Sequence, residues 1–359
     1  MSQTDFQPLP KTKQPLSPGW RKVGAILEVL GIYAAGQLFG MLLFAILGSL
    51  MHIPLKNPLL EITANATQSD LLRITWRLLV LLLCQYAGWL ASAFAVGWWH
   101  RRRTPAQYGL TLACRSIGFY LKTGVVVFGV AELITKLLSL LDSLVPMGEQ
   151  IAWREAMYKL DWTSPAFWLL MAVGSYGLIP ILEELFYRGY VQTRLEEDFG
   201  APVAILATAF LFALSHSQYL ILNPFNIGML LSTIFGAVVW GYIFYRTRSL
   251  LVTIIAHAIV NIPIRGIGLW VEIVAMLIVI IIARREIVRA LADGWSLLRS
   301  IPRGWQAVGI VALFGLFAVA FALLGDVVSL AGIAFFIAAL VLIGIEKRRA
   351  KFQAVAQTN

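Results

Sequence analysis

Long apolar runs constrain this chain more than any other feature, because about 20 apolar residues are enough to cross a bilayer as a helix. Such runs lie near residues 24–50, 76–99, 118–141, 166–190, 201–216, 227–245, 250–263, 267–283, 305–324 and 327–345. Two of them, 201–216 and 250–263, are short for a span. The sequence therefore predicts an all-α fold, a polytopic transmembrane helix bundle of about ten spans (8–10).

Composition and charge agree with that fold class. Hydrophobic residues make up 59% of the chain and charged residues only 13%, against about 25% charged in soluble proteins. Basic residues precede the first run and follow every second run after it: Lys11, Lys13, Arg21 and Lys22; Arg101, Arg102, Arg103 and Arg115; Arg188 and Arg194; Arg246 and Arg248; Arg284, Arg285 and Arg289; Lys347, Arg348, Arg349 and Lys351. This alternation is typical of cytoplasmic loops. We therefore expect both termini in the cytoplasm of an integral, multi-pass protein of the cell (inner) membrane, and the net charge of +10 does not indicate a nucleic-acid partner.

The sequence predicts one membrane domain with polar tails. The first apolar run is too long for the core of a cleaved signal peptide, so we expect it to be retained. Residues 1–20 and 347–359 are expected to be disordered. Cys84 and Cys114 have the spacing of neither a disulfide framework nor a metal site, which favours packing roles for both.

Ionisable residues inside apolar runs cost about 2.5 to 3.5 kcal/mol on insertion scales, which makes each one a candidate for function. The segment LEELFYRGY carries two adjacent glutamates. Glu184 and Arg188 are four residues apart, so they can neutralise each other on one helix face. Glu183 is rotated by about 100° from Glu184 and lacks that partner, which suits a general base. For Glu28 and Glu272, near the ends of their runs, we favour structural or interfacial roles.

Two histidines also lie inside apolar runs, in FLFALSH and IIAHAIVN. His216 lies 16 residues after a turn expected at Gly200, and Glu183 lies 17 residues before it. An antiparallel hairpin would therefore bring His216 and Glu183 to one depth. His257 and Asn261 share a helix face four residues apart, at a similar depth below the basic ends. We expect these four side chains to form one site open to the cytoplasm.

Pro180 lies three residues before Glu183 and predicts a kink in that helix. A hinge and additional room for substrate are both consistent with the kink.

The segments EELFYR, FALSH and HAIVN resemble the EExxxR, FxxxH and HxxxN/B motifs of the CPBP family of intramembrane proteases. That family includes type II CAAX prenyl endopeptidases and bacteriocin-processing, immunity or abortive-infection-like proteins. The resemblance divides the chain into N-terminal spans with a cytoplasmic tail (1–160), a catalytic core (161–265), and additional spans with a basic tail (266–359).

The resemblance implies an endopeptidase in which Glu183 activates a water molecule for attack on a peptide bond. His216 would hold that water or donate a proton to the leaving amine. His257 and Asn261 would stabilise the oxyanion, as donors of this kind do in other hydrolases for about 3 kcal/mol each. Arg188 and Glu184 would orient the site.

A metal cofactor is left open by the sequence. Glu183, His216 and His257 could bind zinc and keep one position for water, but the chain lacks the H-E-x-x-H motif and a Glu–His site needs no ion. The expected partners are the lipid bilayer and a membrane protein or lipidated peptide as substrate. Two other classes remain: a non-catalytic scaffold or bacteriocin-immunity protein, and a transporter, for which the expected two-fold repeat is not found.

Overall fold

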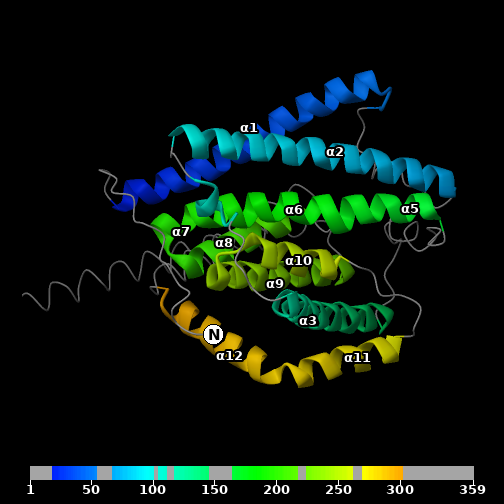
Figure 1. Ribbon diagram of the computed structural model, residues 1–359, viewed down its shortest axis with the longest axis vertical. Helices are drawn as coiled ribbons and strands as arrows, with labels where there is room; N and C mark the ends of the chain where they lie inside the picture. Colours follow the sequence, from blue (N-terminus) through cyan, green and yellow to red (C-terminus); the bar gives the residue numbers. More distant parts are fainter. Residues whose placement is uncertain are drawn as a thin grey trace, which may run out of the picture.

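The computed structural model describes residues 18–54, 67–100, 104–110, 117–144, 164–216, 224–261 and 269–301. Within these ranges the protein is helical and has no strand (Figure 1), so the all-α prediction is confirmed. The elements are α1 (Pro18–Leu50), α2 (Gln68–Ala95), η3 (Val96–His100), η4 (Pro105–Tyr108), α3 (Ile117–Leu144), α5 (Pro165–Leu170), η5 (Met171–Leu178), α6 (Ile179–Glu184), η6 (Leu185–Gln192), α7 (Thr193–Phe199), α8 (Ala201–Leu214), α9 (Pro224–Thr247), α10 (Leu250–Val260), α11 (Leu269–Ile282) and α12 (Arg284–Arg299). The segments η3, η5 and η6 are π-helical, and η4 is a 3₁₀ turn.

Four helices of the described part are long and apolar enough to cross a membrane: Trp20–Leu50, Gln68–Trp99, Pro165–Phe199 and Met229–Thr247. Three shorter apolar helices accompany them, Ala201–Leu214, Leu250–Val260 and Trp270–Ile282. The protein is therefore an integral membrane protein. The total of eight to ten spans, the cytoplasmic termini and the inner-membrane location stay predictions. The runs 305–324 and 327–345, Cys114 and both expected disordered tails fall, wholly or almost wholly, outside the described residues.

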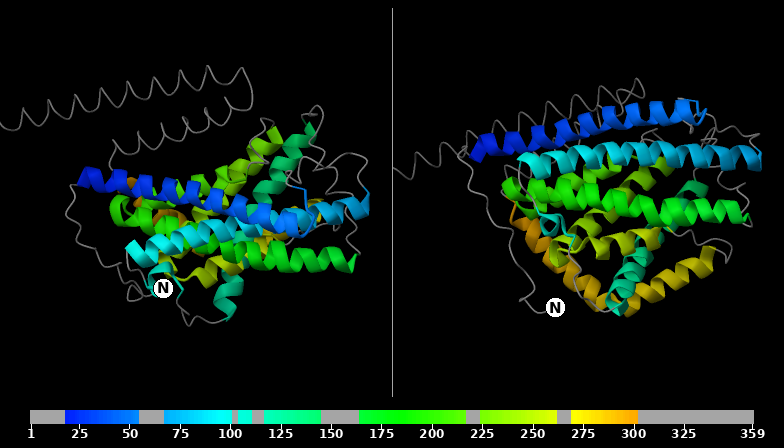
Figure 2. Two further views of the ribbon diagram at one scale, coloured as in Figure 1. Left: turned by 90° about the horizontal axis from the view of Figure 1, so that it is seen from above. Right: turned by 45° about the horizontal axis from the view of Figure 1, so that its top comes forward.

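The helices stack in layers around the helical path from α5 to α7 (Figure 1). Helices α1 and α2 pack on each other, and α2 also contacts α5, α6 and η6. On the other side lie α8, α9 and α10, followed by α3, which packs on α9, α10 and α11. Figure 2 shows α3 running steeply across the direction of α1 and α2. The path from α5 to α7 is therefore enclosed by helices from both halves of the chain.

The contact between α1 and α2 depends on glycines. A Cβ atom added at Gly88 would lie 2.1 Å from the Gly36 carbonyl oxygen, and one added at Gly40 would lie 2.8 Å from the Gln85 Cα atom. Small residues allow such close approach between membrane helices. The Gln85 side-chain amide also donates to the Gln37 amide oxygen across this contact, at 2.9 Å. The register of α2 against α1 is thereby fixed.

The helix that carries both glutamates passes Pro180 by changing its hydrogen-bond pattern. The Ile179 N–H donates to the Gly174 carbonyl, five residues back, within the π-helical segment η5. The next residue, Pro180, has no N–H to continue this pattern. The carbonyl of Ser175 is therefore left without a donor from its own helix. The disturbance expected at Pro180 takes the form of a π-helical segment, a feature that occurs often at functional sites.

A network of buried charges connects α1 to α7. Arg194 is 1% exposed. Its Nε atom donates to Glu28 at 2.8 Å and its Nη1 atom to Asp198 at 2.7 Å, while Arg21 pairs with Asp198 at 2.9 Å. The Tyr190 hydroxyl also donates to Glu28, at 2.7 Å. Arg194, expected in a basic loop, instead lies inside the protein, and Glu28 has the structural role that the sequence favoured.

The basic segment after residue 283 is a helix, α12, rather than the expected loop. Its acidic residues face the protein: Glu286 accepts from Lys122 of α3 at 2.5 Å, and Asp293 accepts from the Tyr242 hydroxyl of α9 at 2.6 Å. Because both contacts join residues far apart in the chain, the pattern of apolar runs could not predict them.

Candidate active site

Glu184 and Arg188 form the centre of the site. Both side chains are fully buried, and Arg188 Nη1 donates to Glu184 Oε1 at 3.0 Å. Arg188 Nη2 donates to the Ala237 carbonyl of α9 at 3.0 Å. The guanidinium also lies over the rings of Phe212, at 4.8 Å, and Trp240, at 5.4 Å. The structure thus forms the pair that helical spacing predicts and encloses it with aromatic rings.

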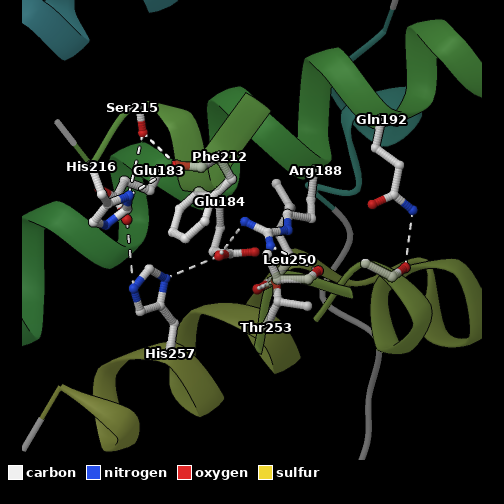
Figure 3. Close-up of polar contacts among 12 residues, drawn as sticks. Glu183, Glu184, Arg188, Gln192, Phe212, Ser215, His216, Leu250, Thr253 and His257 are labelled. Atoms are coloured by element: carbon white, nitrogen blue, oxygen red, sulfur yellow. Dashed lines mark hydrogen bonds and ion pairs between the residues drawn. The ribbon is translucent and has the colours of Figure 1, made fainter. Parts of the chain in front are cut away.

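His257 of α10 connects the two glutamates (Figure 3). Its Nδ1 atom lies 3.0 Å from Glu184 Oε1, within hydrogen-bond distance, and its Nε2 atom lies 3.5 Å from Glu183 Oε2. The imidazole stacks on Trp240 with 4.3 Å between ring centroids and an angle of 18°. Contacts on its edge and on its face therefore fix the orientation of the ring.

Glu183 has different partners from its neighbour. Its side chain is buried, and Oε1 accepts a hydrogen bond from the Tyr86 hydroxyl of α2. Its other oxygen, Oε2, is the one that faces His257. A phenol and an imidazole therefore contact Glu183, whereas a guanidinium neutralises Glu184. The expected difference between the adjacent carboxylates is present in their surroundings.

His216 lies just beyond the C-terminus of α8. Its Nδ1 atom is 2.9 Å from the Phe212 carbonyl oxygen, one turn back, so Nδ1 carries the proton and donates. The other nitrogen, Nε2, is then the acceptor nitrogen of the neutral ring. Figure 3 shows His216 beside Glu183, on the side where Glu183 faces His257.

Asn261 ends α10 one turn after His257. Its Nδ2 atom donates to the Ser175 carbonyl at 2.8 Å, which is the carbonyl that Pro180 leaves without a helical donor. An amide nitrogen carries two protons, so this bond occupies one of them. Direct contacts therefore join Glu183, Glu184, Arg188 and His257, whereas His216 and Asn261 are held next to this group by main-chain carbonyls.

Two residues of the site were missed by sequence reasoning, Tyr86 and Trp240. Each lies in an apolar run among other aromatic residues, where local pattern does not distinguish a site residue from a packing residue. Tyr86 comes from α2, far from the three motifs in sequence. Only the packing of α2 on α6 brings it to Glu183.

Whether the site fits a metal ion can be tested from the side chains that could bind one. Within the described ranges, no three His, Cys, Asp or Glu side chains are grouped so that they could bind a metal ion. Both nitrogens of His257 already face carboxylates, and His216 directs Nδ1 to a carbonyl. The described side chains therefore give no support to the zinc set of Glu183, His216 and His257, which stays a prediction, and the reaction proposed for the site uses no metal.

The fold and the site define a polytopic membrane protein with a buried Glu–Glu–Arg–His cluster, as expected of an intramembrane protease. Residues 162–263 match a family model described as type II CAAX prenyl endopeptidase Rce1-like. This match agrees with the resemblance carried by the three motifs: over this segment the chain is similar to the CAAX-type endopeptidases of the CPBP family of intramembrane proteases. No match is found among curated proteins or solved structures.

Proposed function

We propose that the protein hydrolyses a peptide bond of a membrane-anchored substrate with a water molecule activated by Glu183. The observation that supports this role is the contrast between the two glutamates. Glu184 is neutralised by Arg188 at 3.0 Å, while Glu183 is buried, has no such bond to Arg188, and directs Oε2 towards His257. A general base needs a free lone pair at a fixed position, and Glu183 Oε2 meets that requirement.

The proposed reaction begins when Glu183 Oε2 takes a proton from water as the oxygen attacks the carbonyl carbon of the scissile bond. The C–N bond then breaks, and Glu183 returns the proton to the leaving amine, while the acceptor nitrogen Nε2 of His216 would hold the attacking water. His257 lies within hydrogen-bond distance of Glu184 through Nδ1 and faces Glu183 through Nε2. From this position its imidazole would stabilise the oxyanion of the tetrahedral intermediate.

The remaining site residues would position these groups. Glu184 and Arg188 hold His257 from its Nδ1 side, and the second amide proton of Asn261 is available to the oxyanion. Two hydrogen bonds support these roles: His257 to Glu184 at 3.0 Å, and Asn261 to the Ser175 carbonyl at 2.8 Å.

We infer that the substrate is a membrane protein or a lipidated peptide. The catalytic helix lies within a segment long and apolar enough to span the bilayer, so a substrate has to reach the site from the membrane or its surface. The family description names CAAX prenyl endopeptidases. A prenylated C-terminal peptide is therefore the first substrate to test.

The test uses purified full-length wild-type protein and the Glu183→Gln variant in detergent. Both are incubated with a library of membrane-anchored peptides that includes one CAAX peptide in prenylated and unprenylated form. We expect wild type to cleave and Glu183→Gln to be inactive while remaining folded. Metal content measured on the same samples decides the zinc question. Absence of cleavage by wild type would favour a scaffold or immunity function.

A further inference from the structure

We propose that Tyr86 of α2 is a positioning residue that holds the carboxylate of Glu183 for proton abstraction. Its hydroxyl donates to Glu183 Oε1, and its side chain is buried. Tyr86 lies outside the segment that matches the family model, which covers residues 162–263. The site of this protein is therefore completed by a residue from its N-terminal spans. The inference rests on the proposed role of Glu183 as the base.

The surroundings of Tyr86 restrict its movement. The ring meets Trp89 edge to face, with 5.2 Å between centroids, and Trp89 stacks on Phe186 at 5.1 Å and 18°. Phe186 follows Glu183 by three residues on the same helical path. The glycine contact between α1 and α2 fixes the register from the other side. The phenol is therefore presented to Glu183 by packed groups and not by a flexible segment.

One consequence concerns the orientation of the carboxylate. A carboxylate on a free χ3 torsion can exchange its two oxygens, since this torsion is broad. With Oε1 held by the phenol, Oε2 is the oxygen that faces His257 at 3.5 Å. The site therefore presents one defined lone pair to the attacking water.

A second consequence concerns charge. The phenol donates to Glu183 without adding a positive charge, whereas a Lys or Arg in its place would form an ion pair with the base, as Arg188 does with Glu184.

The same aromatic cluster offers a matched control. The Tyr33 hydroxyl lies 3.0 Å from the Tyr187 hydroxyl, and the Tyr33 ring packs on Trp89 at 4.4 Å. Replacing Tyr33 by Phe therefore removes a hydroxyl from the same packed region. That hydroxyl is bonded to Tyr187 rather than to Glu183.

The experiment compares Tyr86→Phe and Tyr33→Phe with wild type in detergent. For Tyr86→Phe we expect kcat to fall by about tenfold or more, because a bond to a charged group is lost, with KM little changed. Tyr33→Phe should retain the wild-type kcat and KM. A Tyr86→Phe variant with the wild-type kcat, or an equal loss of kcat in Tyr33→Phe, would overturn the proposal.

A readout independent of turnover separates this proposal from the proposed function. The carboxyl stretch of protonated Glu183 is identified by infrared difference titration as the band absent in Glu183→Gln. In Tyr86→Phe the frequency of this band should move, because the hydrogen bond from the phenol to the carboxyl group is lost, while Tyr33→Phe leaves it in place. If wild type cleaves no peptide but the band moves, the contact is supported and the protease mechanism fails. If the protein cleaves but the band does not move, Tyr86 has no positioning role.

Discussion

Adjacent glutamates with opposite surroundings are the central feature of the site at the level of side chains. Glu184 shares a fully buried ion pair with Arg188, while Glu183 has a phenol and an imidazole as neighbours. Helical spacing predicted which of the two would pair with Arg188, because side chains four residues apart meet. It could not predict Tyr86 or Trp240, because contacts between distant helices leave no local pattern.

The two glutamates should respond differently to the same substitution. Glu183→Gln keeps size and hydrogen bonding, so we expect loss of cleavage with thermal stability close to wild type. Glu184→Gln leaves Arg188 buried without its counter-ion, which typically costs about 3 to 5 kcal/mol. Cleavage assays and thermal unfolding in one detergent measure both effects. Equal, purely catalytic losses in the two variants would contradict this division.

Pro180 frees a carbonyl of its own helix for a hydrogen bond from a second helix, α10. The π-helical segment before it and the missing N–H together free the Ser175 carbonyl, which then accepts from Asn261 of α10. The sequence predicted a disturbance at Pro180. The sequence could not predict the hydrogen bond that the disturbance allows, because the Ser175 carbonyl and the Asn261 side chain lie in different helices.

Restoring the missing N–H should therefore weaken the site without weakening the helix. In Pro180→Ala the new N–H competes for the carbonyls near Ser175, so Asn261 loses part of its anchor. We expect cleavage to fall by about tenfold, the effect of one modest hydrogen bond, with unchanged or higher thermal stability. Pro165→Ala is the control, because Pro165 stands at the start of α5, where a helix needs no N–H donor. Wild-type activity in Pro180→Ala would contradict the role assigned to this carbonyl.

Helix α12 should respond to acid through its contact with α3. Lys122 donates to Glu286, and this hydrogen bond lowers the pKa of the Glu286 carboxyl below its usual value. A group with a depressed folded-state pKa stabilises the contact above its unfolded pKa, and the contribution is lost as the pH falls through the folded pKa. Hydrogen exchange of α12 should therefore increase only at pH values below the usual glutamate range. Glu286→Gln should lose this dependence on pH.

Over the whole molecule, buried charge joins the N-terminal helices to the family segment. Arg194 contacts Glu28 of α1 and Asp198 of α7 while only 1% exposed. The rule that basic residues collect in cytoplasmic loops placed Arg194 at the membrane surface. The sequence does not show which basic residues have acidic neighbours in space. The all-helical bundle itself could be predicted, since apolar runs determine it without knowledge of tertiary contacts.

Loss of the ion pairs of Arg194 should lower the free energy of unfolding. We expect Arg194→Ala to destabilise the protein by about 3 to 5 kcal/mol, since it removes the buried cation that Glu28 and Asp198 share. Arg73→Ala is the matched control, because the Arg73–Asp70 pair is exposed and such pairs contribute about 0 to 1 kcal/mol. Chemical denaturation of both variants in one detergent measures the difference. Similar small losses in both would show that the network does not hold the helices together.

The close glycine contact between α1 and α2 has a consequence for how the protein is made. Chains are synthesised from the N-terminus, and early segments begin to fold first. We expect α1 and α2 to associate in the membrane before the segment with Glu183 leaves the ribosome. Tyr86 and Glu28 are then already in place when the costly ionisable residues enter the bilayer. In this order of insertion, the N-terminal pair acts as a template that receives the catalytic helix.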